Sequence, residues 1–186
     1  MQVAIEIRVL YSLGGDDLKR IASAVTMTEK YTVTKTETDE RTIISLERIT
    51  LATPHTKTFS REDDLLDWYK HMPAHGLCLG AFDGDTMVGI AVTDVSEWNN
   101  SAMLWEFHVA DTQRGRGVGR QMMNALVERV KARGLEMIVV ETSSANLGAI
   151  RFYRKLGFEI KSIDLAYYGS DDLERDDVAV FMWRKV

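Results

Sequence analysis

The pattern of hydrophobic and polar positions divides this chain into segments with two different periods. Apolar residues recur every four positions over Val118–Val130, which predicts an amphipathic helix. The segments Ala102–Val109 and Leu135–Val140 on either side of it are almost continuously apolar and have the length of strands. Strand, helix and strand in this order predict a βαβ unit, which should be right-handed.

Shorter segments predict the remaining elements. Before the βαβ unit we expect a strand over 3–10, followed by a helix after Gly14–Asp16 whose inward face is Leu18, Ile21, Ala22 and Val25. A polar hairpin should follow within 32–50, with its turn at Asp39–Glu40. Next we expect a helix that is capped by Ser60–Asp63 and stopped at Pro73, with Leu65, Leu66 and Tyr69 inward, then a hairpin formed by 77–82 and 87–92, and a loop at 98–100. After the unit we expect a helix capped by Asn146 and closed by Gly157, then strands over 158–163 and 178–183. The prediction is a single α/β domain over residues 1–186, with a mixed, mostly antiparallel sheet, a central βαβ unit and flanking helices.

Composition and charge narrow the classes of function. The chain has 186 residues, enough for one domain with a full core, and its hydrophobic fraction of 45% is ordinary for a globular protein. The net charge of −5 argues against a nucleic-acid surface and suits a cationic partner. The single cysteine, Cys78, lies in an apolar run, so we expect a buried thiol. An N-terminus charged too early for a signal peptide, with no membrane-length apolar run, predicts a cytoplasmic protein.

Glycines and arginines gather where the first strand of the βαβ unit meets its helix. The segment Gln113–Arg120 reads Q-R-G-R-G-V-G-R. Glycine lets backbone N–H groups approach a ligand without a Cβ in the way. The first turn of a helix leaves its N–H groups unpaired at the positive end of the macrodipole. The turn therefore predicts an anion site, to which the arginines add charge for phosphates.

Three phosphate-binding patterns can be compared with this turn. The Walker pattern fails, because Arg120 and Gln121 stand where it needs Lys and Ser or Thr. The dinucleotide pattern G-x-G-x-x-G lacks its third glycine, although Glu141 at the end of the next strand keeps this alternative open. The pattern Q/R-x-x-G-x-G/A is fully matched by Arg114–Gly119. A plain helix start that binds nothing is the structural alternative.

Through this third pattern the chain resembles the GNAT superfamily of acetyl-CoA-dependent N-acetyltransferases, in which the loop holds the coenzyme A pyrophosphate. A second motif, N-x-x-x-x-x-F-Y-R-K-x-G-F over Asn146–Phe158, resembles the last helix and turn of the same family. The resemblance covers roughly residues 77–186. Within that stretch the chain is most similar to the streptothricin acetyltransferases, on the strength of Trp98–Asn99, Glu141–Thr142 followed by Asn146, Ile163–Asp164, Tyr168 and the last strand 179–183.

The resemblance implies acetyl-CoA as cosubstrate and a set of residues that bind it. These are Phe107, His108 and Val109 beside the pantetheine arm, the turn residues Arg114, Gly115, Arg116, Gly117, Val118, Gly119 and Arg120, and Asn146 and Tyr153. By the same resemblance the Tyr153 hydroxyl protonates the leaving thiolate. Helix capping by Asn146 and a core role for the Tyr153 ring are the structural alternatives.

The chemistry of amine acetylation points to Glu106. A lysine-type amine has a pKa of about 10 and is mostly protonated at neutral pH, so a base must remove its proton. Glu106 interrupts the apolar strand beside the expected coenzyme site, and His108 shares its face by alternation. A solvent-facing or salt-bridged Glu106 and a packing His108 are the alternatives.

The acceptor is predicted to bind Glu106 together with Trp98, Asp164 and Tyr168, while a cluster of Asp164, Asp171 and Asp172 attracts its charge. We therefore expect an N-acetyltransferase for a primary amine of a small cationic molecule, streptothricin first, which would confer antibiotic resistance. No metal, nucleic acid or membrane is expected, and a homodimer is left open. The alternatives are an enzyme for a polyamine or a protein lysine, a non-catalytic acetyl-CoA sensor, and a dinucleotide-binding domain.

Overall fold

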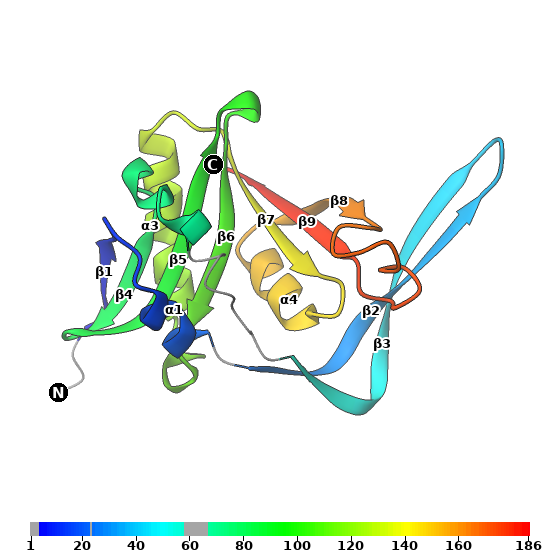
Figure 1. Ribbon diagram of the computed structural model, residues 1–186, viewed down its shortest axis with the longest axis horizontal. Coiled ribbons are helices and arrows are strands. Elements are labelled where there is room, and N and C mark those ends of the chain that lie inside the picture. The colour runs from blue at the N-terminus through cyan, green and yellow to red at the C-terminus, as the bar shows by residue number, and fades with distance from the viewer. Residues whose placement is uncertain (1–3, 23, 58–66) are drawn as a thin grey trace. The chain divides into compact units, whose positions relative to one another are not determined.

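The computed structural model describes residues 4–22, 24–57 and 67–186 (Figure 1). These fall into two compact units. The first comprises Met1–Ala24, Thr58–Val139 and Arg184–Val186, and the second comprises Val25–Lys57 and Val140–Trp183. The single domain expected from the sequence stays a prediction.

The first unit holds an antiparallel sheet. Its strands are β1 (Glu6–Val9), β4 (Leu79–Asp83), β5 (Thr86–Ser96) and β6 (Ser101–Val109), in that spatial order. The turn between β4 and β5 contains Gly84, whose φ of +61° is in the left-handed region. The predicted first strand and the predicted hairpin are confirmed, although β5 continues four residues beyond the expected Val92, because residues 93–96 still pair with β6.

Two helices cover opposite faces of β5 in this unit. They are α1 (Gly15–Ile21) and α3 (Val118–Ala132), and the shorter 3-10 helices are η1 (Met72–His75), η2 (Glu97–Asn99) and η3 (Asp111–Gln113). Ile90 packs in one core cluster with Leu18 and Ile21 of α1. Its neighbour Gly89 points to the other face, where a Cβ atom would lie 2.7 Å from Sδ of Met122 on α3. The predicted amphipathic helix is confirmed, with its six apolar positions from Val118 to Val130 buried.

One local prediction is corrected. Helix α1 ends at Ile21, and Val25 begins a strand instead of continuing the apolar face of the helix. The α-helical residues 67–69 end before Pro73, which agrees with the predicted stop, and Pro73 itself lies in the first turn of the separate η1, where a proline gives up no needed N–H donor. Tyr69 is buried as expected. The predicted cap Ser60–Asp63, with Leu65 and Leu66, lies outside the described residues.

The second unit contains a long hairpin of β2 (Val25–Glu37) and β3 (Thr42–Lys57). Thr, Val and Ile dominate both strands, which favours extended backbone. The turn spans Thr38–Arg41, where the backbone N–H of Thr38 donates to the carbonyl of Arg41 at 2.9 Å. The predicted polar hairpin and its turn at Asp39–Glu40 are confirmed, and both strands are longer than expected.

The rest of this unit alternates strands with one helix. The elements are β7 (Met137–Ser143), α4 (Leu147–Lys155), β8 (Glu159–Asp164) and β9 (Ala179–Lys185), with β9 between β7 and β8. Asn146 caps α4 by accepting from the backbone N–H of Ala149 at 3.1 Å, and Gly157 follows the helix at φ +86°. Arg151 of α4 pairs with Glu29 of the hairpin at 2.6 Å. The predicted α/β class with mostly antiparallel strands is confirmed, and β6, α3 and β7 follow one another in the expected order.

Candidate active site

The glycine-rich turn before α3 has the backbone geometry of an anion site. Gly115 and Gly117 have φ values of +74° and +84°, and no atom lies within 4 Å of the position that a Cβ would take in either. Gly117 is the N-cap of α3, and none of the side chains that the structure describes caps this helix end. The first intrahelical hydrogen bond runs from the N–H of Gln121 to the carbonyl of Gly117. The N–H groups that precede Gln121 in the first turn therefore have no partner within the helix and stand at its positive end.

The arginines of the turn divide into two kinds. Arg114 is held by the protein, because its Nε donates to the carbonyl of Val109 at 3.1 Å and its guanidinium pairs with Asp111 at 2.9 Å. Arg116 and Arg120 are exposed, and neither forms a hydrogen bond or an ion pair with any part of the chain that the structure describes. The buried Gln113 anchors the start of the turn. The turn thus carries two exposed cations, Arg116 and Arg120, while Gln113 and Arg114 fix its first residues to the rest of the protein.

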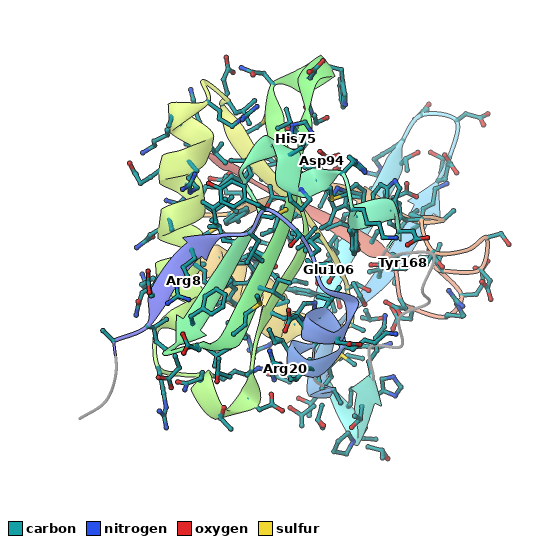
Figure 2. The ribbon with its side chains drawn as sticks, turned by 60° about the vertical axis from the view of Figure 1, so that its left-hand side comes forward. Arg8, Arg20, His75, Asp94, Glu106 and Tyr168 are labelled. Atoms are coloured by element: carbon teal, nitrogen blue, oxygen red, sulfur yellow. The ribbon has the colours of Figure 1, made fainter. Side chains whose placement is uncertain are left out.

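Glu106 of β6, labelled in Figure 2, is a buried carboxylate with two side-chain partners. It is 8% exposed, which excludes the solvent-facing alternative. The Tyr69 hydroxyl donates to its Oε1 at 2.6 Å, and His108 Nε2 lies 2.6 Å from its Oε2. A buried carboxylate is costly unless it is hydrogen-bonded, and here both oxygens have partners. The alternation that places Glu106 and His108 on one face is confirmed.

This arrangement suits a general base. Tyr69 and His108 hold the two carboxylate oxygens of Glu106 at fixed positions, and an ionised carboxylate still has further lone pairs that can accept from an amine. The sequence identified Glu106 and His108 but not the hydroxyl of Tyr69, which is 37 residues away in the chain. Periodicity predicted only that Tyr69 is buried, because contacts between distant elements leave no signal in local spacing.

Three further predicted site residues belong to the first unit. Phe107 and Val109 lie on β6, and Trp98 lies in the connection between β5 and β6. In the β5–β6 register Phe107 is opposite Ala91 and Val109 is opposite Gly89. Trp98 is 86% exposed in η2, beyond the last β5–β6 pair. Ser101 in that pair is five residues from Glu106, which at the rise of a strand is roughly 16 Å. The structure therefore does not bring Trp98 and Glu106 together.

Tyr153 of α4 is a packed aromatic residue. Its ring lies 5.4 Å from the ring centroids of Phe152 and of Phe158, and the side chain is buried. The core role that sequence reasoning kept as an alternative is therefore present. The acid role of its hydroxyl stays a prediction, as do the coenzyme contacts of Asn146.

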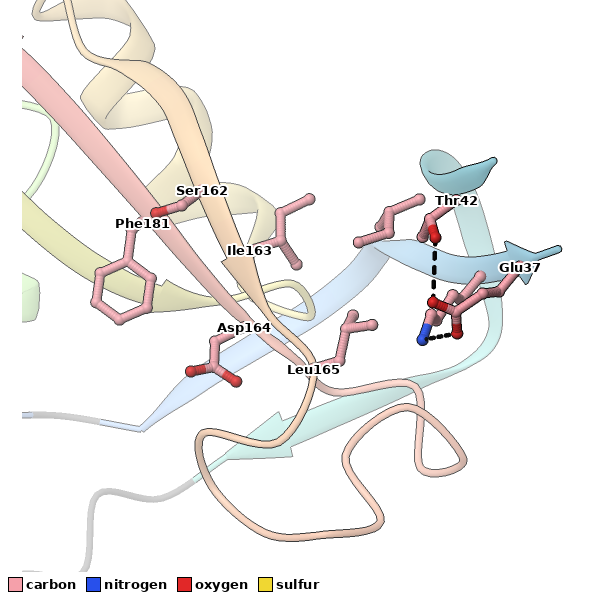
Figure 3. Close-up of a pocket in the computed structure, with 9 residues that line it drawn as sticks. Glu37, Thr42, Ser162, Ile163, Asp164, Leu165 and Phe181 are labelled. Atoms are coloured by element: carbon pink, nitrogen blue, oxygen red, sulfur yellow. Dashed lines mark hydrogen bonds and ion pairs between the residues drawn. The ribbon is translucent and has the colours of Figure 1, made fainter. Parts of the chain in front are cut away.

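The predicted acceptor residues of the second unit lie beside aromatic rings. The Tyr168 hydroxyl donates to Glu141, and the Tyr168 and Tyr167 rings meet edge to face at 5.4 Å. Burial raises the pKa of Tyr168, and Glu141 raises it further, so this hydroxyl stays protonated and acts as a donor. Asp164 borders a cavity of about 440 Å³, whose lining also includes Phe181 (Figure 3).

The predicted acidic cluster is wrong for Asp172. That side chain is fully buried, pairs with Arg175 at 2.7 Å and accepts from the backbone N–H of Tyr168 at 2.7 Å. Asp171 also lies near Arg175, at 3.5 Å. Burial works against the charge of Asp172, but the two backbone N–H donors of Tyr168 and Gly169 and the Arg175 guanidinium leave its pKa lower than usual. Asp172 thus holds the loop after β8 and does not attract a substrate.

The described residues were also compared with three other kinds of feature, namely a metal site, a reactive cysteine and a membrane-spanning helix. Among residues 4–22, 24–57 and 67–186 no group of three or more His, Cys, Asp or Glu side chains is placed to hold a metal ion. Cys78 is buried as predicted, and burial raises the pKa of its thiol to about 11. Within the same ranges, every helix is too short or too polar to cross a membrane.

Comparison with known proteins gives one family. The model of the acetyltransferase (GNAT) family matches residues 43–158, more than half of the chain. A streptothricin acetyltransferase of Streptomyces lavendulae is 34% identical over 86 residues, which cover 46% of this chain and 45% of that protein. The match thus spans less than half the length of that relative.

Two solved structures share the fold over nearly their whole length. A nourseothricin acetyltransferase superposes with a TM-score of 0.73 at 25% identity, covering 98% of this chain and 99% of that one. A Bacillus anthracis protein described as a streptothricin acetyltransferase, in complex with acetyl coenzyme A, superposes with a TM-score of 0.71 at 20% identity, covering 100% and 99%.

Proposed function

Because the chain belongs to the acetyltransferase (GNAT) family, we propose that it transfers the acetyl group of acetyl-CoA to a primary amine of a small cationic acceptor. The observation that carries this proposal is the buried Glu106 carboxylate, held by Tyr69 and His108 on the strand that leads to the glycine-rich turn. A base that removes the proton of an ammonium group and a cradle for the coenzyme phosphates are the two parts that the reaction needs.

The proposed reaction begins with coenzyme binding. The N–H groups at the start of α3 donate hydrogen bonds to the pyrophosphate, while Arg116 and Arg120 offset its charge. Backbone groups of Phe107, His108 and Val109 pair with the pantetheine arm as an added strand would. Asn146 is proposed to contact the same arm.

Proton transfer and acyl transfer follow. Glu106 takes a proton from the acceptor's ammonium group, and the neutral nitrogen attacks the thioester carbonyl carbon. The tetrahedral intermediate collapses, the carbon–sulfur bond breaks, and the thiolate takes a proton from the Tyr153 hydroxyl, which regains one from the nitrogen as the amide forms. The amide and free coenzyme A leave the site, and Glu106 releases its proton to solvent.

Streptothricin is the first acceptor to test. The name of the Streptomyces lavendulae relative and that of the Bacillus anthracis protein specify this drug. The antibiotic-resistance role follows from that choice of acceptor, and Trp98, Asp164 and Tyr168 are proposed to contact it. Cytoplasmic location and assembly into a homodimer stay predictions. Transfer to a polyamine or to a protein lysine is the alternative.

The test measures thiol release from acetyl-CoA over a panel of amines that includes streptothricin. Glu106→Gln should lower kcat by about a hundredfold or more, because Gln keeps the size of Glu but cannot take a proton. The loss should shrink at high pH, where more of the amine is already neutral. A pH–rate profile like that of the parent would remove Glu106 from the mechanism.

Two further measurements separate the alternatives. Tyr153→Phe should lower kcat and leave acetyl-CoA binding unchanged, since only the hydroxyl is lost. Coenzyme binding without thiol release on any amine would favour the non-catalytic sensor, and binding of NAD would favour the dinucleotide alternative.

A further inference from the structure

We propose that the second unit contains a recess that recognises a second cation of the acceptor, an ammonium or guanidinium group separate from the reacting amine. This cation recess consists of Asp164 and Phe181, which line a cavity, of Tyr167, whose ring meets Phe181 and Tyr168, and of Glu141, which accepts from the Tyr168 hydroxyl. The inference rests on the proposed function, because it specifies which amines that reaction selects.

The aromatic part of the cation recess is a chain of rings at steep angles. Tyr167 meets Phe181 at 5.3 Å and 88°, and it meets Tyr168 at 5.4 Å and 78°. Tyr167 and Tyr168 remain 42% and 40% exposed, so much of their surface is available to a ligand. Aromatic faces attract cations, and the Tyr168 ring already does so, since Lys57 Nζ lies 5.6 Å from its centroid.

Two carboxylates lie near these rings. Glu141 accepts from the hydroxyl of Tyr168, whose ring meets that of Tyr167, and Asp164 is close to Tyr167 in the chain. Burial raises the pKa of Tyr167, and the charges of Glu141 and Asp164 raise it further, in agreement with this arrangement. Asp164 Oδ1 accepts from the backbone N–H of Ala166 at 2.9 Å, which fixes the orientation of the carboxylate. A negative environment with exposed π faces favours a cation over a neutral or anionic group.

The cavity beside Asp164 and Phe181 is large enough for such a group. Its volume is about 440 Å³, within the usual range for small-molecule sites. Figure 3 shows Asp164 and Phe181 on one side of β8 and β9, whereas Ile163 and Leu165 lie on the side toward the hairpin and Glu37. Lys35, the cation of the lining, pairs with Glu37 at 2.5 Å, so Asp164 leaves the lining with a net negative charge.

The test compares agmatine with butylamine, which share a primary amine and a four-carbon chain but differ by one guanidinium group. The parent should use agmatine with a kcat/KM about tenfold higher or more, which corresponds to one good cation–π or charge contact. Asp164→Asn should bring the ratio close to one without changing the KM for acetyl-CoA. This variant keeps the oxygen that accepts from Ala166, so it should fold normally.

Two other variants complete the design. Tyr167→Leu should also lower the ratio, because it removes the ring. Glu174→Gln, an equal change of charge on an exposed residue of the same loop, should leave the ratio as in the parent. A parent without preference for agmatine, or a ratio unchanged in both Asp164→Asn and Tyr167→Leu, would overturn the cation recess.

Calorimetry with agmatine and the full chain separates this inference from the proposed function. If no amine gives thiol release, the proposed function fails, and binding then decides the inference alone. Agmatine binding that Asp164→Asn weakens about tenfold supports the cation recess, whereas absent or equal binding overturns it.

Discussion

Two glycines at opposite ends of α3 allow a matched test of the anion site. Gly117 precedes the helix at φ +84° and Gly134 follows it at φ +72°, and a Cβ at either would meet no atom within 4 Å. Gly117→Glu and Gly134→Glu therefore introduce the same side chain, the same charge and nearly the same backbone strain. They differ in which end of the helix receives the carboxylate.

The expected magnitudes follow from strain and charge. A non-glycine residue in the left-handed region costs about 1–2 kcal/mol, so both variants should lose about that much free energy of unfolding. At an effective dielectric constant of 20, two unit charges about 4 Å apart repel by about 4 kcal/mol. If exposure halves this to about 2 kcal/mol, coenzyme A should bind Gly117→Glu roughly 30-fold more weakly than the parent. Gly134→Glu should bind it within about twofold of the parent.

Calorimetric titration with coenzyme A, together with urea unfolding of all three proteins, checks both magnitudes. Added salt should restore part of the affinity of Gly117→Glu, since the lost term is electrostatic. Equal affinity losses in the two variants would attribute the effect to strain alone. Parent-like affinity of a folded Gly117→Glu would refute the placement of the phosphates at this helix end.

Three other results are expected. Tyr69→Phe should lower kcat about tenfold in steady-state assays and leave the KM for acetyl-CoA unchanged, because it removes one of the donors that hold Glu106. An unchanged kcat would contradict the positioning role of the Tyr69 hydroxyl. Burial acts to raise the pKa of Asp176, but Lys30 and the Val33 N–H outweigh burial and leave that pKa lower than usual. The charge of Asp176 therefore stabilises the fold above the ordinary aspartate pKa of about 3.9, and this stabilisation is lost as the pH falls through the lower pKa of the folded state. Asp176→Asn should therefore reduce the free energy of unfolding at pH 7 but not at pH 2, as urea titrations at the two pH values would show. Cys78, with a thiol pKa of about 11, should react with a thiol reagent at pH 8 about a hundredfold more slowly in the native protein than in urea, and equal rates would contradict its burial.

Local pattern was sufficient for most of the elements. The four-residue period of α3 and the cap at Asn146 are properties of neighbouring residues, and both are found where the sequence placed them. The end of α1 was missed because Val25 continues its apolar spacing although the chain has already become extended. The position of Val25 fits the period of the helix, whereas valine itself favours a strand, and pairing of Val25 with β3 makes it part of the strand.

The sequence was sufficient to identify candidate site residues but not the side chains that contact them. Glu106 stood out because a carboxylate interrupts an apolar strand, yet its hydrogen bond to Tyr69 depends on how separate elements meet. Asp172 was misread for the same reason, since a run of acidic residues on a loop gives no sign that one of them is fully buried against Arg175. No binding role was predicted for Tyr167 or Phe181, because only the contact of their rings connects them.

The close contact at Gly89 links coenzyme affinity to a position with no polar side chain. A methyl group there would lie 2.7 Å from Sδ of Met122 on α3 and 3.2 Å from the Cβ of Ala81, so the Met122 side chain would have to shift, and α3 with it wherever that side chain does not yield. The N–H groups that form the anion cradle belong to the same helix and would move with it. A conservative change in the core could therefore alter coenzyme affinity without any change in the turn itself. Variants selected for weaker or tighter coenzyme binding should accordingly include substitutions at this buried glycine, where a search restricted to charged positions would never find them.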